Sequence, residues 1–202
     1  EDQSLVEETI EYWQDKSAID RVKEIWSQKH PDINVDDYRS AGVWADVVGA
    51  PMGRMCVDYG KVLNLGLEGI MAEARAHLDR LPIASREGLR KREFLNAVVT
   101  SCQAVIKFAR RYAALARSMA QDEPLPERKK ELDRIAETCD RVPAKPARSF
   151  YEALQSFWFI HVCLLVEHVS WGFSPGRFPM YMYPFYKADK EAGRITEEGA
   201  LE

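Results

Sequence analysis

The residues best suited to chemistry lie near the end of the chain, in WGFSPGRFPMYMYPFYKAD, residues 171–189. Ser174-Pro175-Gly176-Arg177 predicts a turn that carries a guanidinium group, whose rigid fork of donors suits a carboxylate. Arg177 is therefore a candidate for binding or orienting a substrate. A purely structural role, in which Arg177 ties this loop to a carboxylate elsewhere, is the alternative and stays open.

Aromatic side chains surround this turn, and we expect the whole stretch to form a rigid aromatic loop. Trp171 and Phe173 follow the most apolar segment of the chain, so they are candidates for the lining of an apolar pocket. Packing in the core is the alternative for both. The later aromatic residues, from Tyr181 to Tyr186, are more typical of packing than of chemistry.

The remaining polar candidates are weaker. His161 lies among apolar residues and is more typical of a core histidine with a partner than of a ligand. Glu167 and His168 are neighbours in a predicted helix, so their side chains point in different directions and form no obvious dyad.

The four cysteines are far apart in the sequence and form no metal-binding pattern: Cys56, Cys102, Cys139 and Cys163. The chain contains no Cys-x-x-Cys motif and no Cys/His pair at the spacing of metal ligands, so we expect no metal site. Cys102 and Cys163 lie in apolar stretches and are interpreted as small core residues. A reducing cytoplasm is the simplest compartment for such a chain.

The composition is that of an ordinary globular protein, with 46% hydrophobic and 30% charged residues among 202. A formal net charge of −4 and the lack of a basic stripe argue against nucleic-acid binding. The apolar run of residues 150–166 contains several polar residues and is too short to cross a bilayer unaided. We interpret it as a buried helix, apolar on nearly every face.

The pattern predicts a mainly α-helical chain. The clearest start signals are a capping box at Ser4 and Glu7, and a second at Ser149 and Glu152. Gly66 and Gly69 lie inside a predicted helix and indicate close approach of a neighbouring backbone. Two short helices are expected to begin at Ser4 and Ser17, and the second ends before His30-Pro31. A long loop over 31–57 follows, with a short helical turn near 42–48. The remaining expected helices cover residues 58–81, 85–120, 127–141 and 150–166.

The chain has the pattern of an internal fragment of a longer protein. Thr196 is typical of an N-cap, but only six residues follow it, and isolated helices that short are unstable. The apolar helix over residues 150–166 also needs neighbours on every side, which the other amphipathic helices do not obviously supply.

Three segments carry a resemblance to a known family: PARSFYEALQSFWFIHVCLLVE, SPGRFPMYMYPFYKADKEAGRIT and VDYGKVLNLGLEGI. With the opening EETIEYWQDKSAIDRV, they resemble the pyruvate formate-lyase-like glycyl radical enzymes, in the family's order and over essentially the whole chain. The resemblance implies the helical N-terminal part of a large enzyme with a ten-stranded β/α barrel. Residues 1–202 would then be part of the family domain, divided into 1–57 (helices and a long loop), 58–141 (long helices) and 142–202 (buried helix and aromatic pocket loop).

The resemblance also implies a chemistry whose catalytic residues lie outside this chain. In the family, a C-terminal glycine carries a radical that a partner activase of the radical S-adenosylmethionine type installs. The radical moves to a cysteine in a Gly-Cys-x-Glu loop, and the thiyl takes a hydrogen from a small-molecule substrate. No cysteine of this chain lies in such a loop, so we expect no catalytic residue here and no activity of the fragment alone. The full-length enzyme is expected to be a cytoplasmic, oxygen-sensitive homodimer of anaerobic metabolism.

The identity of the substrate stays open. The pocket candidates implied by the resemblance are Ser170, Trp171, Phe173 and Arg177. Diol dehydratase-like members tend to have His-Ser where this chain has Trp171-Gly172, which weakens a glycerol-like substrate and favours an aryl or bulky one, as in arylacetate decarboxylases. Choline lyase-like and sulfonate lyase-like members remain alternatives. A stand-alone helical interaction module without catalysis is the rival interpretation.

Overall fold

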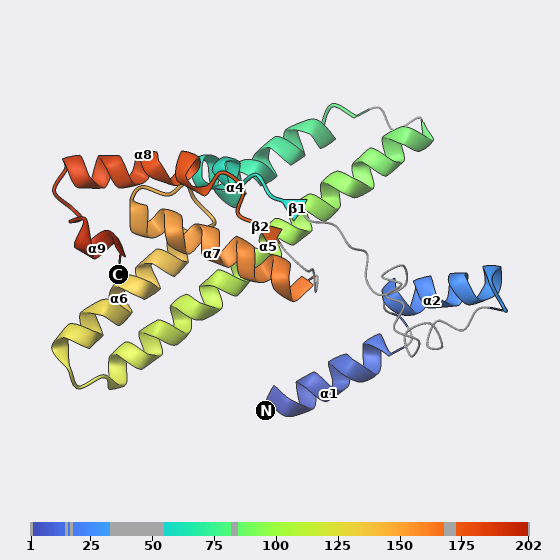
Figure 1. Ribbon diagram of the computed structural model, residues 1–202, viewed down its shortest axis with the longest axis horizontal. Helices are drawn as coiled ribbons and strands as arrows, with labels where there is room; N and C mark the ends of the chain where they lie inside the picture. The colour runs from blue at the N-terminus through green and yellow to red at the C-terminus, as the bar shows by residue number, and fades with distance from the viewer. Residues whose placement is uncertain are drawn as a thin grey trace. The chain divides into compact units, whose positions relative to one another are not determined.

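The computed structural model describes residues 2–14, 16, 18–32, 55–81, 85–167 and 173–201, and these are mainly helical, as predicted (Figure 1). The structure separates into a unit of residues 1–55 and 169–172 and a unit of residues 56–168 and 173–202. Most of the loop predicted over residues 31–57, including the helical turn predicted near 42–48, lies outside the described residues.

In the first unit, the described residues form α1 (Asp2–Trp13) and α2 (Ala18–Lys29). The predicted start of the first helix is wrong, because α1 begins at Asp2 and Ser4 therefore lies within its first turn. Glu7 accepts a side-chain hydrogen bond of 3.4 Å from Gln3, which lies one turn earlier on the same face. The second helix ends directly before the His-Pro pair that predicts its end.

The elements that follow form the second unit, apart from the first residue of β1. In chain order they are β1 (Met55–Cys56), α4 (Tyr59–Leu78), α5 (Arg86–Asp122), α6 (Pro126–Arg141), α7 (Phe150–Glu167), β2 (Phe173–Ser174), α8 (Phe178–Glu191) and α9 (Glu198–Leu201). The four helices predicted between residues 58 and 166 are confirmed to within three residues at each end. The two short strands pair with each other.

Side-chain caps fix the beginnings of several helices, and those at Ser149 and Thr196 were predicted from the sequence. In each cap a side-chain oxygen accepts a hydrogen bond from a backbone N–H three residues later: Asp58 from Lys61 (3.0 Å), Ser85 from Gly88 (3.0 Å), Ser149 from Glu152 (3.1 Å), and Thr196 from Gly199 (3.0 Å). Each cap satisfies a donor that the first turn of a helix leaves without an intrahelical partner.

α4 is broken at Gly66, whose φ of 66° and ψ of 166° are not helical. Lys61 and Glu73 form an ion pair of 2.6 Å although they are twelve residues apart, a spacing that spans about 18 Å in a straight helix. The two halves of α4 therefore bend sharply toward each other at Gly66.

The segment between α6 and α7 fills this break. Three backbone hydrogen bonds join it to α4: Leu67 N–H to the Pro143 carbonyl (2.8 Å), Glu68 N–H to the Ala144 carbonyl (2.9 Å), and Ala147 N–H to the Leu63 carbonyl (3.0 Å). The first two donors are amides that the break deprives of their helical partners, so the connecting segment supplies the acceptors that a continuous helix would have supplied.

Gly66 is required at this junction for two reasons. Its positive φ disfavours every residue with a Cβ, and a Cβ at this position would lie 2.5 Å from the carbonyl oxygen of Ala144 and from the carbonyl carbon of Lys145. The predicted close approach is thus confirmed for Gly66. It is wrong for Gly69, where a Cβ would meet only Leu65 of the same helix within 4 Å.

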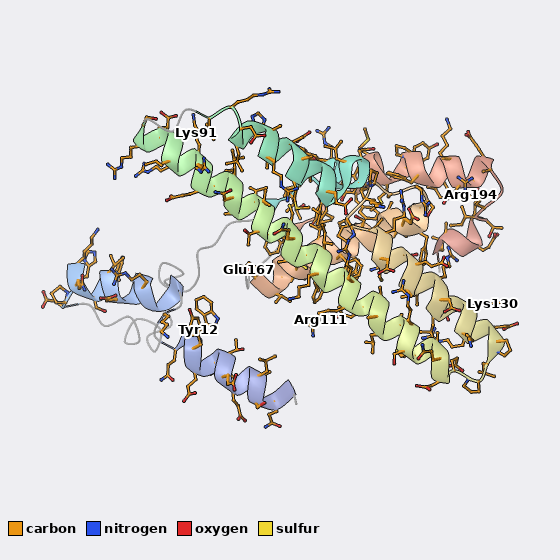
Figure 2. All side chains as sticks on the ribbon, turned by 180° about the vertical axis from the view of Figure 1, so that it is seen from behind. Tyr12, Lys91, Arg111, Lys130, Glu167 and Arg194 are labelled. Atoms are coloured by element: carbon orange, nitrogen blue, oxygen red, sulfur yellow. The ribbon has the colours of Figure 1, made fainter. Side chains whose placement is uncertain are left out.

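α5 and α6 form a long antiparallel pair (Figure 1). In the C-terminal part of α5 the buried residues are small, which lets the two helices approach closely: Ala109, Ala113, Ala116 and Ala120. Leu132, Ala136 and Cys139 form the buried face of α6. Charged side chains such as Arg111 and Lys130 lie on the outer surface of the pair (Figure 2).

α7 begins at a buried carboxylate. Glu152 is 8% exposed and accepts hydrogen bonds from the Arg148 backbone N–H (2.8 Å), the Arg148 guanidinium (2.7 Å) and Arg141 Nε (3.3 Å). The second bond of the predicted capping box is therefore made one residue earlier than expected, to Arg148 instead of Ser149. Burial alone would raise the pKa of Glu152, but the hydrogen bonds from Arg148, together with Arg141, hold that pKa below its ordinary value.

α7 is apolar on nearly every face, and among the described residues it is only partly covered, as expected for a helix whose neighbours the other amphipathic helices do not fully supply. Phe159 and Ile160 are buried, whereas Trp158 is 55% and Val166 is 78% exposed. The reason is that α4, α5, α6 and α8 contact α7 but leave part of its apolar surface uncovered. None of the described helices combines the length and apolar composition that crossing a membrane requires.

The expectation of an aromatic loop is wrong for residues 178–189, which lie in α8. Pro179 lies in the first turn, where a missing N–H costs nothing. Phe178, Tyr181, Met182 and Phe185 recur at spacings of three and four, so they share one face of the helix. They pack in a cluster with Leu63 of α4 and with Ala153 and other side chains of α7.

Asp189 then fixes the far end of α8 to the beginning of α7. Its carboxylate is 4% exposed and accepts a hydrogen bond of 2.8 Å from the Phe150 N–H. The Arg194 guanidinium lies 2.7 Å from the same carboxylate, so the buried charge is paired.

We predict that Gly66→Ala lowers the free energy of unfolding by about 3 kcal/mol or more, because it adds left-handed strain and displaces hydrogen-bonded backbone. Gly193→Ala is the matched control, since Gly193 has a φ of 67° and no atom within 4 Å of the added Cβ. It should cost only the strain, about 1–2 kcal/mol. Denaturant unfolding measures both, and equal losses would contradict the close approach.

We predict that Glu152 stabilises the fold in a pH-dependent way. Its pKa is lowered on folding, so its contribution is fully present above the ordinary value of 4.5 and disappears as the pH falls through the lowered pKa. Glu152→Gln should lower the free energy of unfolding by about 1–3 kcal/mol at pH 7. Thermal unfolding should show that the difference in stability between variant and wild type becomes smaller toward pH 3. Glu131→Gln, at an exposed ion pair with Arg128, is the control. A Glu152→Gln deficit that is independent of pH would refute the assignment.

Candidate functional site

The structure places two of the four predicted pocket residues. Ser170 and Trp171 lie outside the described residues. Phe173 is the first residue of β2 and is buried, at 7% exposed. Arg177 is exposed and stands at the N-cap of α8. Phe173 and Arg177 thus flank one turn, which connects β2 to α8.

This turn, residues 174–177, packs tightly against β1. The N–H of Gly176 donates to the Ser174 hydroxyl at 3.1 Å. Gly176 has a φ of 66°, and a Cβ there would lie 2.5 Å from Cys56 Sγ. Cys56 belongs to β1, which pairs with β2, so the thiol fills the space that a side chain at position 176 would need.

A tyrosine from α8 closes the turn. The Tyr181 hydroxyl donates a hydrogen bond of 2.5 Å to the carbonyl of Pro175. Burial, with smaller contributions from Tyr59 and Cys56, raises the pKa of Tyr181 to about 12. The hydroxyl therefore stays protonated, and available as a donor, throughout the physiological pH range.

A second, partly buried pair lies next to Tyr181. The Tyr59 hydroxyl and His161 Nδ1 are 3.0 Å apart and join α4 to α7. Tyr59 is 1% exposed, and burial is the main cause that raises its pKa. Phe157 stacks on the His161 ring with centroids 5.5 Å apart, and Phe173 meets the same His161 ring edge-on with centroids 6.5 Å apart. The prediction that His161 has a partner within the core is confirmed.

Arg177 is the cationic group at this site. Within the described residues it forms neither an ion pair nor a side-chain hydrogen bond, so the structural alternative, a tie to a carboxylate, is not observed there. It also precedes the first turn of α8, whose N–H groups favour a negative charge. The arrangement of a buried aromatic ring and an exposed guanidinium on one rigid turn can orient a small anionic molecule that has an apolar part.

Cys56 is exposed and lies against this turn, whereas two other cysteines are not available to it as nucleophiles. Cys102 and Cys139 are buried in helices, and burial raises the pKa of both thiols, that of Cys139 to about 11. The described residues contain no cluster of three or more His, Cys, Asp or Glu side chains that could hold a metal ion.

An apolar cleft of about 350 Å³ lies elsewhere, between α5, α6 and α7. Tyr112, Leu115, Met119 and Trp158 line it and are each about half exposed. Neither Phe173 nor Arg177, the two predicted pocket residues that the structure describes, contributes to it, so these two residues and the cleft are separate.

Sequence reasoning missed Tyr59 and Tyr181 as parts of the site. The signal for Tyr181 was present, because the spacing of residues 178, 181, 182 and 185 has helical periodicity and would have placed this tyrosine on the buried face, toward the turn. No local pattern links Tyr59 to His161, which are 102 residues apart.

The family model described as pyruvate formate lyase-like matches residues 1–202. Among curated relatives, isethionate sulfite-lyase of Oleidesulfovibrio alaskensis is 46% identical over 147 residues, which are 72% of this chain and 18% of that protein. Indoleacetate decarboxylase of Tractidigestivibacter scatoligenes is 31% identical over 200 residues, 96% of this chain and 22% of that protein. The chain thus spans about a quarter or less of the length of the curated relatives it matches.

The fold is also similar to solved structures. The hydroxyproline dehydratase of Clostridioides difficile, with trans-4-hydroxy-L-proline bound, superposes with a TM-score of 0.79 at 28% identity, over 95% of this chain and 24% of that one. The helical arrangement described above is therefore similar to one part of that larger enzyme.

We predict that Gly176→Ala destabilises the chain through two separable causes, left-handed strain and overlap with Cys56. Cys56→Ala alone should be nearly neutral because Cys56 is exposed. In the double variant the overlap disappears and about 1–2 kcal/mol of strain remains, so the two changes should be non-additive in denaturant unfolding. Strictly additive effects would show that Cys56 does not limit the turn.

Proposed function

This chain belongs to the pyruvate formate lyase-like family, and from that premise we propose that it is part of a glycyl radical lyase acting on a small organic substrate. The family match over all 202 residues is the observation that carries the proposal. Residues 1–57, 58–141 and 142–202 would be successive parts of the family domain. The last of these would contribute a wall of the substrate pocket.

The proposed contribution of this chain is substrate binding, with Ser170, Trp171, Phe173 and Arg177 as the residues involved. The thiyl cysteine and the radical-bearing glycine would lie in other parts of the protein. The burial and raised pKa of Cys102 and Cys139 support this division of roles, because a buried thiol cannot reach a substrate.

For the substrate, we propose a small anion, with a sulfonate such as isethionate as the first candidate. Two observations support this choice. The isethionate sulfite-lyase is more similar to this chain than the indoleacetate decarboxylase is. A sulfonate also keeps its negative charge at any physiological pH, which suits the permanently cationic and unpaired Arg177.

An aryl carboxylate is the second candidate. Trp171 and Phe173 would favour a bulkier, apolar substrate than glycerol, and indoleacetate has the anionic group that Arg177 requires. The two candidates share the anion and differ in size, so a direct comparison of the two substrates separates them.

The proposed cofactor is a glycyl radical, and the proposed partners are an activase of the radical S-adenosylmethionine type and a second copy of the full-length enzyme. The proposed location is the cytoplasm. Neither the glycyl radical nor the two protein partners are proposed to contact the four pocket candidates.

A helical interaction module without catalysis is the rival, and the half-exposed side chains of the cleft between α5, α6 and α7 favour it. The 202-residue chain alone separates the two. A module should be monodisperse, unfold cooperatively and bind little hydrophobic dye, whereas part of a larger enzyme should bind dye or aggregate through surfaces such as that of Trp158.

The decisive test uses the protein expressed from the complete reading frame that contains these codons, activated anaerobically by its activase. We expect a glycyl radical signal by electron paramagnetic resonance, and release of sulfite from isethionate. Carbon dioxide released from indoleacetate instead would favour the aryl candidate. The absence of a radical signal under conditions that activate a known family member would contradict the proposed function.

In that protein, we predict that Trp171→Ala lowers kcat/KM by roughly 10- to 100-fold, because misplacing a substrate by about 1 Å costs this much. The radical content should be unchanged, since Trp171 is proposed to bind the substrate only. Lys130→Ala, at an exposed charged side chain of α6, is the control. Unchanged turnover in the Trp171 variant would remove this residue from the pocket.

A further inference from the structure

We propose that Tyr181 is a positioning residue: its hydroxyl fixes the turn of residues 174–177 and thereby sets the direction of the Arg177 guanidinium toward an anionic substrate. The inference rests on the proposed function and adds to it a residue that was interpreted from the sequence as packing only.

The contacts of the turn leave a specific role for Tyr181. Inside the turn, the Gly176 N–H is already bonded to the Ser174 hydroxyl, and Pro175 has no N–H to donate. The Pro175 carbonyl accepts its hydrogen bond from Tyr181, at 2.5 Å. Pro175 lies two residues before Arg177, and Tyr181 lies four residues after it in the first turn of α8. The hydrogen bond therefore connects the chain on both sides of Arg177.

The Tyr181 ring itself packs against α4 and against its own helix, α8. Its centroid lies 5.9 Å from that of Tyr59 on α4 and 5.7 Å from that of Phe178 on α8. Tyr59 is held in turn by its hydrogen bond to His161 on α7. The hydroxyl of Tyr181 is therefore a rigid reference point, as positioning requires.

The other face of the turn is fixed by packing. Gly176 lies against Cys56, with no room for a side chain. The turn is thus held between Cys56 on one strand and Tyr181 on one helix, while the Arg177 side chain is exposed and unpaired within the described residues. Loss of the Tyr181 hydroxyl would release one of these two constraints without removing the ring.

The experiment is a double-mutant cycle in the complete, activated enzyme, with whichever of isethionate and indoleacetate the wild type turns over. Tyr181→Phe should raise KM about 10-fold with a smaller change in kcat, because it misplaces a binding group. In an Arg177→Ala background, Tyr181→Phe should have no further effect on KM, since there is no guanidinium left to position. Radical content and thermal stability should change little in either background.

Tyr183→Phe is the matched control. It removes the same hydroxyl from the same helix at a ring that is 58% exposed, so it should leave KM and kcat as they are. Additive effects of Tyr181→Phe and Arg177→Ala on KM, or an unchanged KM in Tyr181→Phe, would overturn the inference. A wild-type protein without radical or turnover would contradict the proposed function itself and overturn the inference with it.

Discussion

The interaction on which the rest of the second unit depends is the backbone junction at Gly66. A helix of twenty residues is interrupted there, and the connection between α6 and α7 supplies the acceptors that the interruption removes. Because peptide groups make these bonds, the junction has little tolerance for displacement: moving either segment leaves buried donors without partners, which costs more than a typical surface contact gains. The bend brings the two halves of α4 into one cluster of apolar side chains that also contains Ile160 of α7, while Leu63 packs in a second cluster with the beginning of α7.

The candidate site is built on that junction. The N-terminal half of α4 holds Tyr59, which bonds to His161 on α7 and packs against Tyr181 on α8. Asp189, at the other end of α8, caps α7. The turn between β2 and α8 therefore rests on three helices whose relative positions follow from the break in α4 and from two long-range hydrogen bonds. A loop supported in this way can hold a binding group in a fixed direction, which is what a substrate-binding wall needs.

The sequence predicts those features that depend on neighbouring residues. Ser149 and Thr196 were recognisable as caps because a cap and its donor are three residues apart. Gly66 indicated a close approach but not its partner, since the partner lies some eighty residues further along the chain. α8 was missed because its prolines and aromatic residues resemble a loop, whereas Pro179 is harmless in a first turn and the buried face decides the structure. Tyr59 and His161 could not be paired from the sequence, because only the tertiary fold brings α4 and α7 together.

The central claim is that the turn between β2 and α8 faces a small anionic substrate through Arg177. A structure of the complete protein with a bound substrate or unreactive analogue tests it most directly. The account predicts that the Arg177 guanidinium lies within hydrogen-bond distance of the anionic group, with Phe173 in the wall of the same pocket. An Arg177 paired with a carboxylate of the protein, and a ligand bound elsewhere, would contradict it.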